Sequence, residues 1–460
     1  MPPVTHAHAA AEAPPTLLDA LARAPAAAAL VFAALEWADR RALRLAHPQL
    51  RDAVGEATTK LQADLMDAAA ARPLTPHHWP RLEELTVSWP DLAALEALGS
   101  GAWASLRSIC IDQHASLALD VTSARALVAA LWRMPALRAL ELRSVRLSDE
   151  AAAELFRASR VEGAPQLREL SIRHARLTLA AARMLASAGW RLEALNLWGN
   201  EDLGAAGVAA LVAAPTFLAL RSLDLSDCGL DAAALLAVAN AHWPLEELDL
   251  SQNDFSAAAA AAVTALAALS RIACLRCLHV GSCKLSAAGF KALVEATWPA
   301  LDDLVADNAA VAFDGPHALG AAAFAGFPAL EVLDLHEVRL GEAGAALLAS
   351  RRWPRLGDLY VSGCAMGDGG LAALARGDWA ALWRIDLRWN DLGAPLTLED
   401  ARRWAPKLVQ VEAGEEEGWE PEVGWEAEEE GWAEDEAGGS GAAGGGESSG
   451  SGESEGVQSE

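Results

Sequence analysis

The stretch from Leu220 to Leu230, LRSLDLSDCGL, decides the fold, because its apolar residues fall at offsets 0, 3, 5, 8 and 10. Leucines two positions apart, at 223 and 225, indicate a short strand with one buried face. The spacing recurs in twelve copies with a mean period of about 27 residues, and their first residues are Leu82, Leu106, Leu137, Leu167, Leu192, Leu220, Leu245, Leu275, Leu301, Leu330, Leu356 and Leu382. A strand repeated at this period predicts a solenoid in which each unit packs against its neighbours.

The pattern resembles the leucine-rich repeat, L-x-x-L-x-L-x-x-[NC]-x-L, over residues 79–412. This resemblance implies an α/β solenoid, a curved horseshoe with parallel strands on the concave face and helices on the convex face. Helices expected at 232–241 and 286–297 would carry the chain back between strands. The period and the segment 367–375, GDGGLAALA, look like the intracellular, ribonuclease-inhibitor type of repeat. At the [NC] position, the side chain is expected to hydrogen-bond backbone groups that the bend leaves unpaired.

Tryptophans precede many of the repeats. They stand two or three residues before the first leucine, at Trp79, Trp103, Trp190, Trp243, Trp298, Trp353 and Trp379. A bulky ring where the helix returns to the strand is predicted to fill the edge of the core.

Composition divides the chain into four parts. They are a disordered N-terminus at 1–15, a helical segment without the repeat at 16–74, the repeat domain at 75–412 with a degenerate closing copy, and a disordered acidic tail at 413–460. The tail is rich in Glu, Gly and Ser, and from Glu412 onward it holds 17 acidic residues and no basic one. Such a composition buries too little apolar surface to order the chain.

Charge and cysteine content exclude several classes of protein. The 460 residues include 36 Lys and Arg against 63 Asp and Glu, a formal net charge of −27 at pH 7. This charge repels phosphate backbones and anionic lipids, so neither a nucleic acid nor a membrane is an expected partner. Six cysteines are too few for a disulfide framework, and the N-terminus lacks a secretory signal. The sequence predicts a soluble, intracellular and cytoplasmic protein, with the nucleus or the cytoskeleton and axoneme as open alternatives.

A second spacing lies ahead of the array, where LVFAAL at 30–35 is followed by an acidic and several apolar positions. It is similar to the F-box, and the matching positions that would bind the adaptor are Leu30, Phe32, Leu35, Asp39, Leu43, Leu45 and Leu50. The resemblance implies binding to the adaptor subunit of a cullin-based ubiquitin ligase. The sequence departs from the F-box pattern in two places. Ala24-Pro25 stands in place of the opening Leu-Pro, and Pro48 interrupts the expected docking helix. The alternative is an amphipathic cap that shields the first repeat.

Side chains at offsets 2, 4 and 6 of each repeat alternate with the buried set and are expected to line the concave face. Asp224, Ser226, Asp249 and Ser251 are the usual filler there. Residues that depart from this filler are predicted to contact a partner: Arg143, Arg173, Trp198, His279, Asp307, His336, Tyr360 and Arg388. We expect two patches, Arg143–Arg173–Trp198 and His336–Tyr360–Arg388, on a face about 50 Å long that fits a protein partner better than a metabolite.

The sequence offers little for catalysis. Cys274-x-x-Cys277 with Cys283 looks like half of a metal site, but Cys283 occupies the [NC] position and is expected to point into the core. Without a second pair at metal spacing, no metal site is predicted. Cys277 and His279 share the exposed face, but nothing supplies a third group to orient them. The sequence therefore predicts a protein that is not an enzyme, with no catalytic residues and no cofactor.

The leading hypothesis is a protein–protein interaction scaffold of the F-box and leucine-rich-repeat type, a substrate receptor of a cullin-based ubiquitin ligase. In it, residues 25–54 hold the adaptor and the concave face selects the substrate. Repeats followed by an acidic tail also resemble, in organisation only, the Ran GTPase-activating protein, which makes a regulator of a small GTPase an alternative. A structural role in a cytoskeletal or axonemal assembly is a third.

Overall fold

The repeat array forms one continuous parallel sheet. The computed structural model describes residues 59–64, 76–77, 79–88, 92–112, 118–214, 217–256, 259–308, 319–394 and 396–413. Within them, 14 strands pair in chain order, and their bounds are β1 Lys60–Asp64, β2 Glu84–Ser88, β3 Ser108–Asp112, β5 Ala139–Arg143, β7 Glu169–Arg173, β8 Ala194–Asn196, β9 Ser222–Asp224, β10 Glu247–Asp249, β11 Cys277–His279, β12 Asp303–Val305, β13 Val332–Asp334, β14 Asp358–Tyr360, β15 Arg384–Asp386 and β16 Gln410–Glu412. A short second sheet pairs β4 Ala118–Leu119 with β6 Arg146–Leu147.

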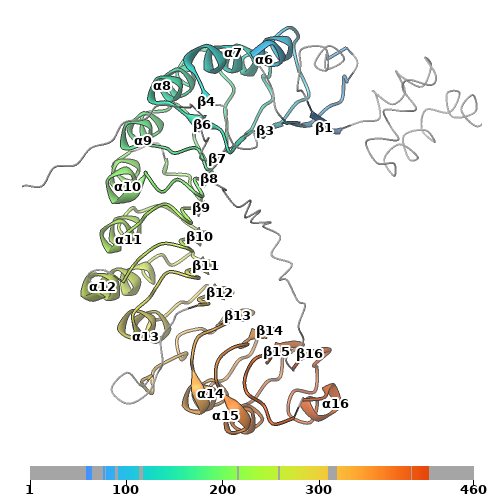
Figure 1. Ribbon diagram of the computed structural model, residues 1–460, viewed down its shortest axis with the longest axis vertical. Helices are drawn as coiled ribbons and strands as arrows, with labels where there is room; N and C mark the ends of the chain where they lie inside the picture. Colours follow the sequence, from blue (N-terminus) through green and yellow to red (C-terminus); the bar gives the residue numbers. More distant parts are fainter. Residues whose placement is uncertain are drawn as a thin grey trace, which may run out of the picture. The chain divides into compact units, whose positions relative to one another are not determined.

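Helices return the chain from one strand to the next. They are α6 Leu92–Leu98, α7 Val121–Leu131, α8 Asp149–Ala158, α9 Leu179–Ala186, α10 Gly204–Val212, α11 Ala232–Ala239, α12 Ala259–Leu269, α13 Ala287–Glu295, α14 Gly341–Ala349, α15 Gly367–Leu374 and α16 Leu398–Ala401. In Figure 1 the helices follow the outer side of the arc and the strands its inner side. The predicted horseshoe, with a concave sheet and convex helices, is confirmed.

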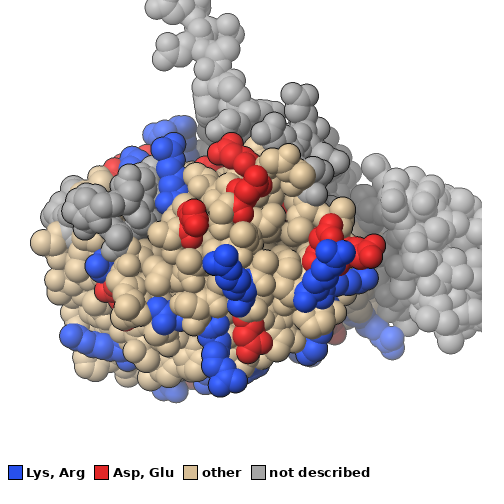
Figure 2. Space-filling view, turned by 90° about the horizontal axis from the view of Figure 1, so that it is seen from below, with Lys and Arg blue, Asp and Glu red and all other residues tan. Residues whose placement is uncertain are grey.

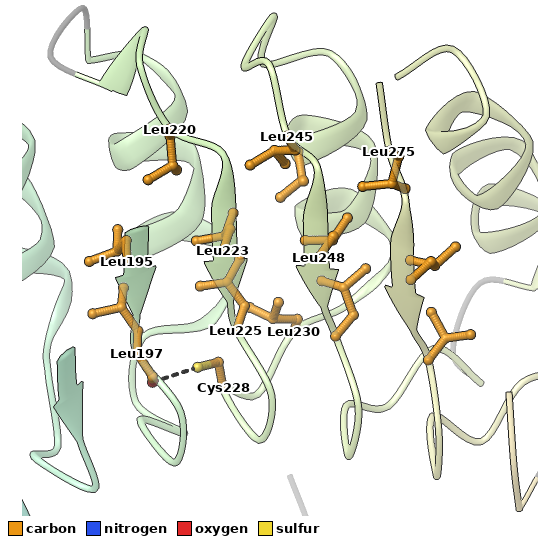
Figure 3. Packing of buried hydrophobic residues seen from close by; sticks show 14 of the residues in the cluster. Leu195, Leu197, Leu220, Leu223, Leu225, Cys228, Leu230, Leu245, Leu248 and Leu275 are labelled. Atoms are coloured by element: carbon orange, nitrogen blue, oxygen red, sulfur yellow. Dashed lines mark hydrogen bonds between the residues drawn. The ribbon is translucent and has the colours of Figure 1, made fainter. Parts of the chain in front are cut away.

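The leucines at offset 3 of successive repeats form a buried column. Leu195, Leu223 and Leu248 are direct partners in the strand register, and each is no more than 2% exposed. Figure 3 shows these side chains on the same side of neighbouring strands. Each repeat therefore buries its leucines only by stacking on the next, as the sequence predicts.

The cysteines at the [NC] position point inward, as expected. The Sγ of Cys228 donates to the backbone oxygen of Leu197 in the preceding repeat at 3.1 Å (Figure 3). Cys283 and Cys364 make the same contact, at 3.0 Å with the Leu250 oxygen and at 3.1 Å with the Leu335 oxygen. Burial raises the pKa of the Cys283 thiol to about 12, so this thiol stays protonated and unreactive.

In the ten repeats whose corner the structure describes, one left-handed residue turns the chain immediately before the [NC] position. The non-glycine residues with positive φ at this offset are Ser144, His174, Asp227, Gln252, Ser282, Asn308, Glu337 and Trp389. Glycine fills it at Gly199 and Gly363, with φ of 73° and 65°. Non-glycine residues in this conformation cost about 1–2 kcal/mol each, so its recurrence shows that the corner is imposed by the stacking of the repeats.

The tryptophans fill the edge of the core, as predicted. Trp103, Trp298, Trp353 and Trp379 are no more than 2% exposed. In each, the indole Nε1 donates to the backbone oxygen five residues earlier, where a helix ends, at 2.8 to 3.0 Å. The indole N–H is thus satisfied by a carbonyl in the last turn of the helix, which fixes the ring at the edge of the core.

Two expected helices end two residues earlier than expected, α11 at Ala239 and α13 at Glu295, and polar side chains fix where each begins. The Asp231 side chain accepts from the backbone N–H groups of Ala233 and Ala234, which starts α11. Ser286 caps α13 in the same way through Gly289. One domain prediction needs correction: Lys60–Asp64, assigned to the helical segment 16–74, is a strand that pairs in register with β2.

Several predictions lie outside the described residues. These are the disordered N-terminus at 1–15, the F-box-like positions from Leu30 to Leu50 and the acidic tail beyond residue 413. The chain divides into two units, Met1–Glu415 and Glu416–Glu460. In the part of the chain that the structure describes, no helix has the length and apolar character needed to cross a bilayer.

Candidate functional site: the concave face

Strand register arranges the concave side chains in rows. Side chains on either side of each buried central leucine face away from the helices. One row runs through Ser222, Glu247, Cys277 and Asp303, and the next through Asp224, Asp249, His279 and Val305. Residues some 25 positions apart in sequence therefore become neighbours on this face.

Arg143, Arg173 and Trp198 come together, as the first predicted patch requires. Arg143 Nε pairs with Glu141 Oε1 at 2.9 Å, and the Arg173 guanidinium pairs with the same oxygen. The Cζ of Arg173 lies 5.7 Å from the Trp198 ring centroid, within cation–π range. Burial opposes ionisation of Glu141, but Arg143 and Arg173 outweigh it and lower the pKa of this carboxyl.

The expected exposure of Arg173 is not observed. Arg173 as a whole is 8% exposed, and its side chain is 10% exposed. The Arg143 side chain is 45% exposed. The charge of Arg173 is neutralised inside the face by Glu141, so its role there is to hold Glu141 and Trp198 in place. Arg143 and Trp198 are the members of this patch that a partner can reach.

His336, Tyr360 and Arg388 do not share one contact network in the way the second patch suggests; each has its own partner. His336 Nδ1 lies 2.9 Å from Ser362 Oγ, and the Tyr360 hydroxyl accepts from Arg384 Nη1 at 2.9 Å. Arg388 is again 8% exposed, and its Nη2 lies 2.6 Å from Asp386 Oδ2 and 3.0 Å from Glu412 Oε2. The expected exposure of Arg388 is therefore also corrected.

His279 sits between two carboxylates and a thiol. Its Nδ1 lies 3.6 Å from Asp249 Oδ2, and its Nε2 lies 3.9 Å from Asp303 Oδ2 and 3.2 Å from Cys277 Sγ. Burial alone would lower the pKa of His279, but Asp249, Asp303 and Cys277 outweigh it and raise it to about 12. The sequence shows only the thiol–imidazole pair, because Asp249 and Asp303 come from the strands on either side.

Seven aspartates from six of the seven repeats between β9 and β15 form what we call the acidic band. They are Asp224, Asp249, Asp303, Asp307, Asp334, Asp358 and Asp386. Several also fix the end of their strand, because one carboxylate oxygen accepts the backbone N–H two residues later. The pairs are Asp224 with Ser226, Asp249 with Ser251, Asp334 with His336 and Asp386 with Arg388, and Asn196 does the same with Trp198.

Burial and neighbouring carboxylates raise the pKa values of several aspartates in the acidic band. Burial, followed by the charge of Asp249, raises the pKa of Asp224. Burial also raises the pKa of Asp307. For Asp334, burial with the nearby charges of Asp307 and Asp386 raises the pKa to about 6. These carboxylates are ionised at neutral pH at a cost that an arriving cation would relieve.

The comparison with protein families agrees with the geometry of the repeats. The sequence model described as Leucine Rich repeat matches residues 356–375, which contain β14 and α15. This segment has a strand, a buried residue at the [NC] position and a return helix, in the order that most of the described repeats follow. The chain is a leucine-rich repeat protein.

Two solved structures are similar to this leucine-rich repeat protein. A structure titled "Crystal structure of Rad7 and Elc1 complex in yeast" aligns at 15% identity and a TM-score of 0.48, covering 84% of this chain and 92% of that chain. A structure titled "Crystal structure of TLR13-ssRNA13 complex" aligns at 17% identity and a TM-score of 0.38, covering 73% of this chain and 39% of that chain. A comparison with curated proteins gives no match.

Two exposed tryptophans near the end of the leucine-rich repeat array were missed at the sequence level. Trp383 is 40% exposed and stacks on Arg384, whose Cζ lies 4.8 Å from its ring centroid. Trp389 is 50% exposed and occupies the left-handed corner position. Their offsets, 1 and 7, lie outside both the buried set and the three concave positions. That mismatch is the signal that could have marked them.

Charge on the end of the molecule differs from charge in the acidic band. Figure 2 looks at the array from below the view of Figure 1. Lys, Arg, Asp and Glu side chains are interspersed there over a mostly uncharged surface. The concentration of one sign in the acidic band is therefore a local feature.

Proposed function

We propose that this leucine-rich repeat protein binds a protein partner on its concave face and that the acidic band receives a basic segment of that partner. The observation that carries the proposal is the run of carboxylates across neighbouring strands from β9 to β15. Six strand spacings of about 4.8 Å make the band roughly 29 Å long. An extended peptide of about nine residues has that length.

Electrostatics within the acidic band support a cationic ligand. Arg388 neutralises Asp386 at 2.6 Å, and Arg384 Nε lies 3.6 Å from Asp358 Oδ1. Asp224, Asp307 and Asp334 keep raised pKa values because burial and neighbouring carboxylates oppose their ionisation. A lysine or arginine at this surface would stabilise their charged forms, and binding would therefore release the proton of Asp334 near pH 6.

We further propose that the protein acts as a substrate receptor of a cullin-based ubiquitin ligase, binding rather than catalysing. The support is the F-box-like spacing from Leu30 to Arg51 directly ahead of the repeats. In this arrangement residues 25–54 bind the adaptor subunit, and the concave face holds the substrate.

The concave proposal is tested with a matched pair of double variants in the full chain. Asp224→Asn with Asp334→Asn removes two charges and keeps the strand ends, since Asn196 already serves at the equivalent position. Glu150→Gln with Glu342→Gln makes the same charge change on α8 and α14. Partners captured by each are quantified by mass spectrometry, and one is then titrated as purified protein.

The aspartate variant should lose a partner that the glutamate variant keeps, and affinity for it should fall as salt rises. Equal capture by both variants would remove the acidic band from recognition.

The receptor proposal has a separate test. Purified adaptor subunit is titrated against the full chain, against Phe32→Ala with Leu35→Ala, and against the Asp224→Asn, Asp334→Asn variant. Only the first variant should lose the adaptor. If the wild-type chain does not bind the adaptor, the proposed role as a substrate receptor of a ubiquitin ligase is wrong. The proposal that the concave face binds a basic segment of a partner is unaffected by that result.

A further inference from the structure

Three potential metal ligands of different chemistry meet at the middle of the concave face. Cys277 and His279 lie on β11, and Asp303 on β12 is the register partner of Cys277. One ligand atom from each of them lies within 4.8 Å of the others. The arrangement follows from the stacking of repeats, because Asp303 lies 26 residues after Cys277 in the sequence.

We propose that Cys277, His279 and Asp303 form a zinc site. Zinc takes thiolate at about 2.3 Å and imidazole or carboxylate at about 2.0–2.2 Å, which in a tetrahedron places ligand atoms about 3.3–3.6 Å apart. The observed separations from His279 Nε2 are 3.2 Å to Cys277 Sγ and 3.9 Å to Asp303 Oδ2. These values bracket that range. One sulfur, one nitrogen and one oxygen ligand suit zinc better than magnesium or calcium, which prefer oxygen.

Asp303 supplies an independent observation. Its Oδ1 is buried and has no hydrogen-bond partner in the structure. An unpaired buried carboxylate oxygen is costly. The other oxygen, Oδ2, faces His279 Nε2 at 3.9 Å, so a metal ion held by both oxygens would reduce this cost.

Asp249 provides the outer contact that zinc-bound histidines usually have. Its Oδ2 lies 3.6 Å from His279 Nδ1, on the register partner of His279 in β10. A carboxylate at Nδ1 fixes the ring so that Nε2 points to the metal. Nε2 is the nitrogen that faces Cys277 and Asp303.

The surroundings also favour a cation. The register neighbours of Cys277 and His279 are Glu247, Asp249, Asp303 and Val305, none of which is basic. Zinc binding would release the protons of Cys277 and His279 into solution. Three protein ligands leave one tetrahedral position for water, and the ion would join two neighbouring repeats.

The proposed site differs from the half-site suggested by Cys274-x-x-Cys277 with Cys283. Cys283 is buried, and its Sγ donates to the Leu250 oxygen at 3.0 Å. The Sγ of Cys274 donates to the Leu245 oxygen at 3.2 Å. Neither belongs to the cluster of three ligand atoms. Cys274 therefore serves as a matched control.

The test uses the full chain, stripped of metal by a chelator and kept reduced. Zinc affinity is measured by competition with a chromophoric chelator, and Co²⁺ is used as a spectroscopic probe. Wild type should bind one Zn²⁺, and its Co²⁺ form should show a sulfur-to-metal charge-transfer band and the visible bands of tetrahedral geometry. Cys277→Ser should abolish the charge-transfer band, and His279→Gln or Asp303→Asn should weaken zinc binding by at least about tenfold.

Cys274→Ser should leave both the zinc affinity and the cobalt spectrum unchanged. Cys277→Ser and Asp303→Asn preserve side-chain size, and circular dichroism verifies their fold. Two results would overturn the proposal: wild type that binds no zinc, or a Cys277→Ser, Asp303→Asn double variant that binds zinc as tightly as wild type. The second result would place the ion elsewhere on the chain.

Discussion

Asn253 and Cys228 belong to neighbouring repeats, and the Asn253 side-chain oxygen accepts the backbone N–H of Cys228 at 3.1 Å. The same oxygen accepts the N–H of Leu230 at 2.9 Å. The Asn253 amide nitrogen donates to the backbone oxygens of Leu225 and Leu250. One buried side chain thus satisfies four backbone groups and joins two repeats.

Replacing Asn253 with Ala should destabilise the array strongly. It leaves buried backbone groups without partners, each worth about 1–3 kcal/mol, so the unfolding free energy should fall by about 2–4 kcal/mol. Denaturant unfolding of the full chain measures the loss. Gln252→Asn is the control, because residue 252 is exposed and asparagine tolerates the left-handed conformation. An equal loss in the control would assign the effect to the corner and not to the amide.

Arg388 should act as a structural residue. Its replacement by Met leaves Asp386, which is 3% exposed, without its bidentate cation, and removing one partner of a buried pair costs about 3–5 kcal/mol. Adding Asp386→Asn should recover much of this loss, since asparagine needs no cation. Thermal unfolding of both single variants and the double variant measures the coupling. Additive losses would show that the pair does not hold the end of the array.

Asp334 should make the protein more stable in mild acid. Its folded pKa of about 6 lies above the ordinary value of 3.8, so the folded chain binds this proton more tightly than the unfolded chain between those values. Its contribution to stability therefore increases as pH falls from 7 towards 4. Asp334→Asn, which is always neutral, should be more stable than wild type at pH 7 by up to about 3 kcal/mol.

The advantage of Asp334→Asn should disappear near pH 4, where the wild-type carboxyl is protonated. Asp254→Asn is the opposite control. Hydrogen bonds from Ser256 and Lys284 lower the pKa of Asp254 to about 2, so this substitution should not stabilise the protein at pH 7. A gain from Asp334→Asn that persists at pH 4 would contradict the titration of Asp334.

Trp389 should contribute to partner binding and not to folding. It is 50% exposed and has φ of 58°, a conformation that glycine adopts freely. Trp389→Gly should keep the thermal midpoint within a few degrees and weaken binding of a partner that reaches the rim at this end of the array about tenfold or more, as exposed tryptophans often act as hot spots. Isothermal titration with the captured partner tests this, with the buried Trp379 showing the opposite pattern: its replacement should unfold the repeat. Unchanged affinity would leave Trp389 as ordinary surface.

The sequence predicts the array well because its signal is local. The spacing of Leu220, Leu223 and Leu225 fixes which face is buried, and twelve copies fix the stacking. The register then follows, as the column through Leu195, Leu223 and Leu248 confirms. The strand at Lys60–Asp64 has no copy of the full pattern, which explains why it was assigned to the helical segment.

The sequence predicts which side chains lie on the concave face, but it does not predict whether they are exposed or paired. Offsets 4 and 6 correctly place Arg173 and Arg388 on it, but whether they are exposed depends on Glu141 and Asp386 and on the neighbouring repeats. The cluster around His279 likewise needs Asp249 and Asp303 from two other repeats. Such contacts carry no short-range motif, so they emerge only when the strands are laid side by side.

The left-handed corner that precedes each [NC] position has a geometric consequence. The stacking that imposes each corner also fixes a small rotation between one repeat and the next, and these rotations add along the array. A change at an early corner such as Ser144 would therefore swing all later coils together. The radius of the arc is set by the sum of many small rotations between repeats. This radius in turn limits the size of the partner that fits within the concave face.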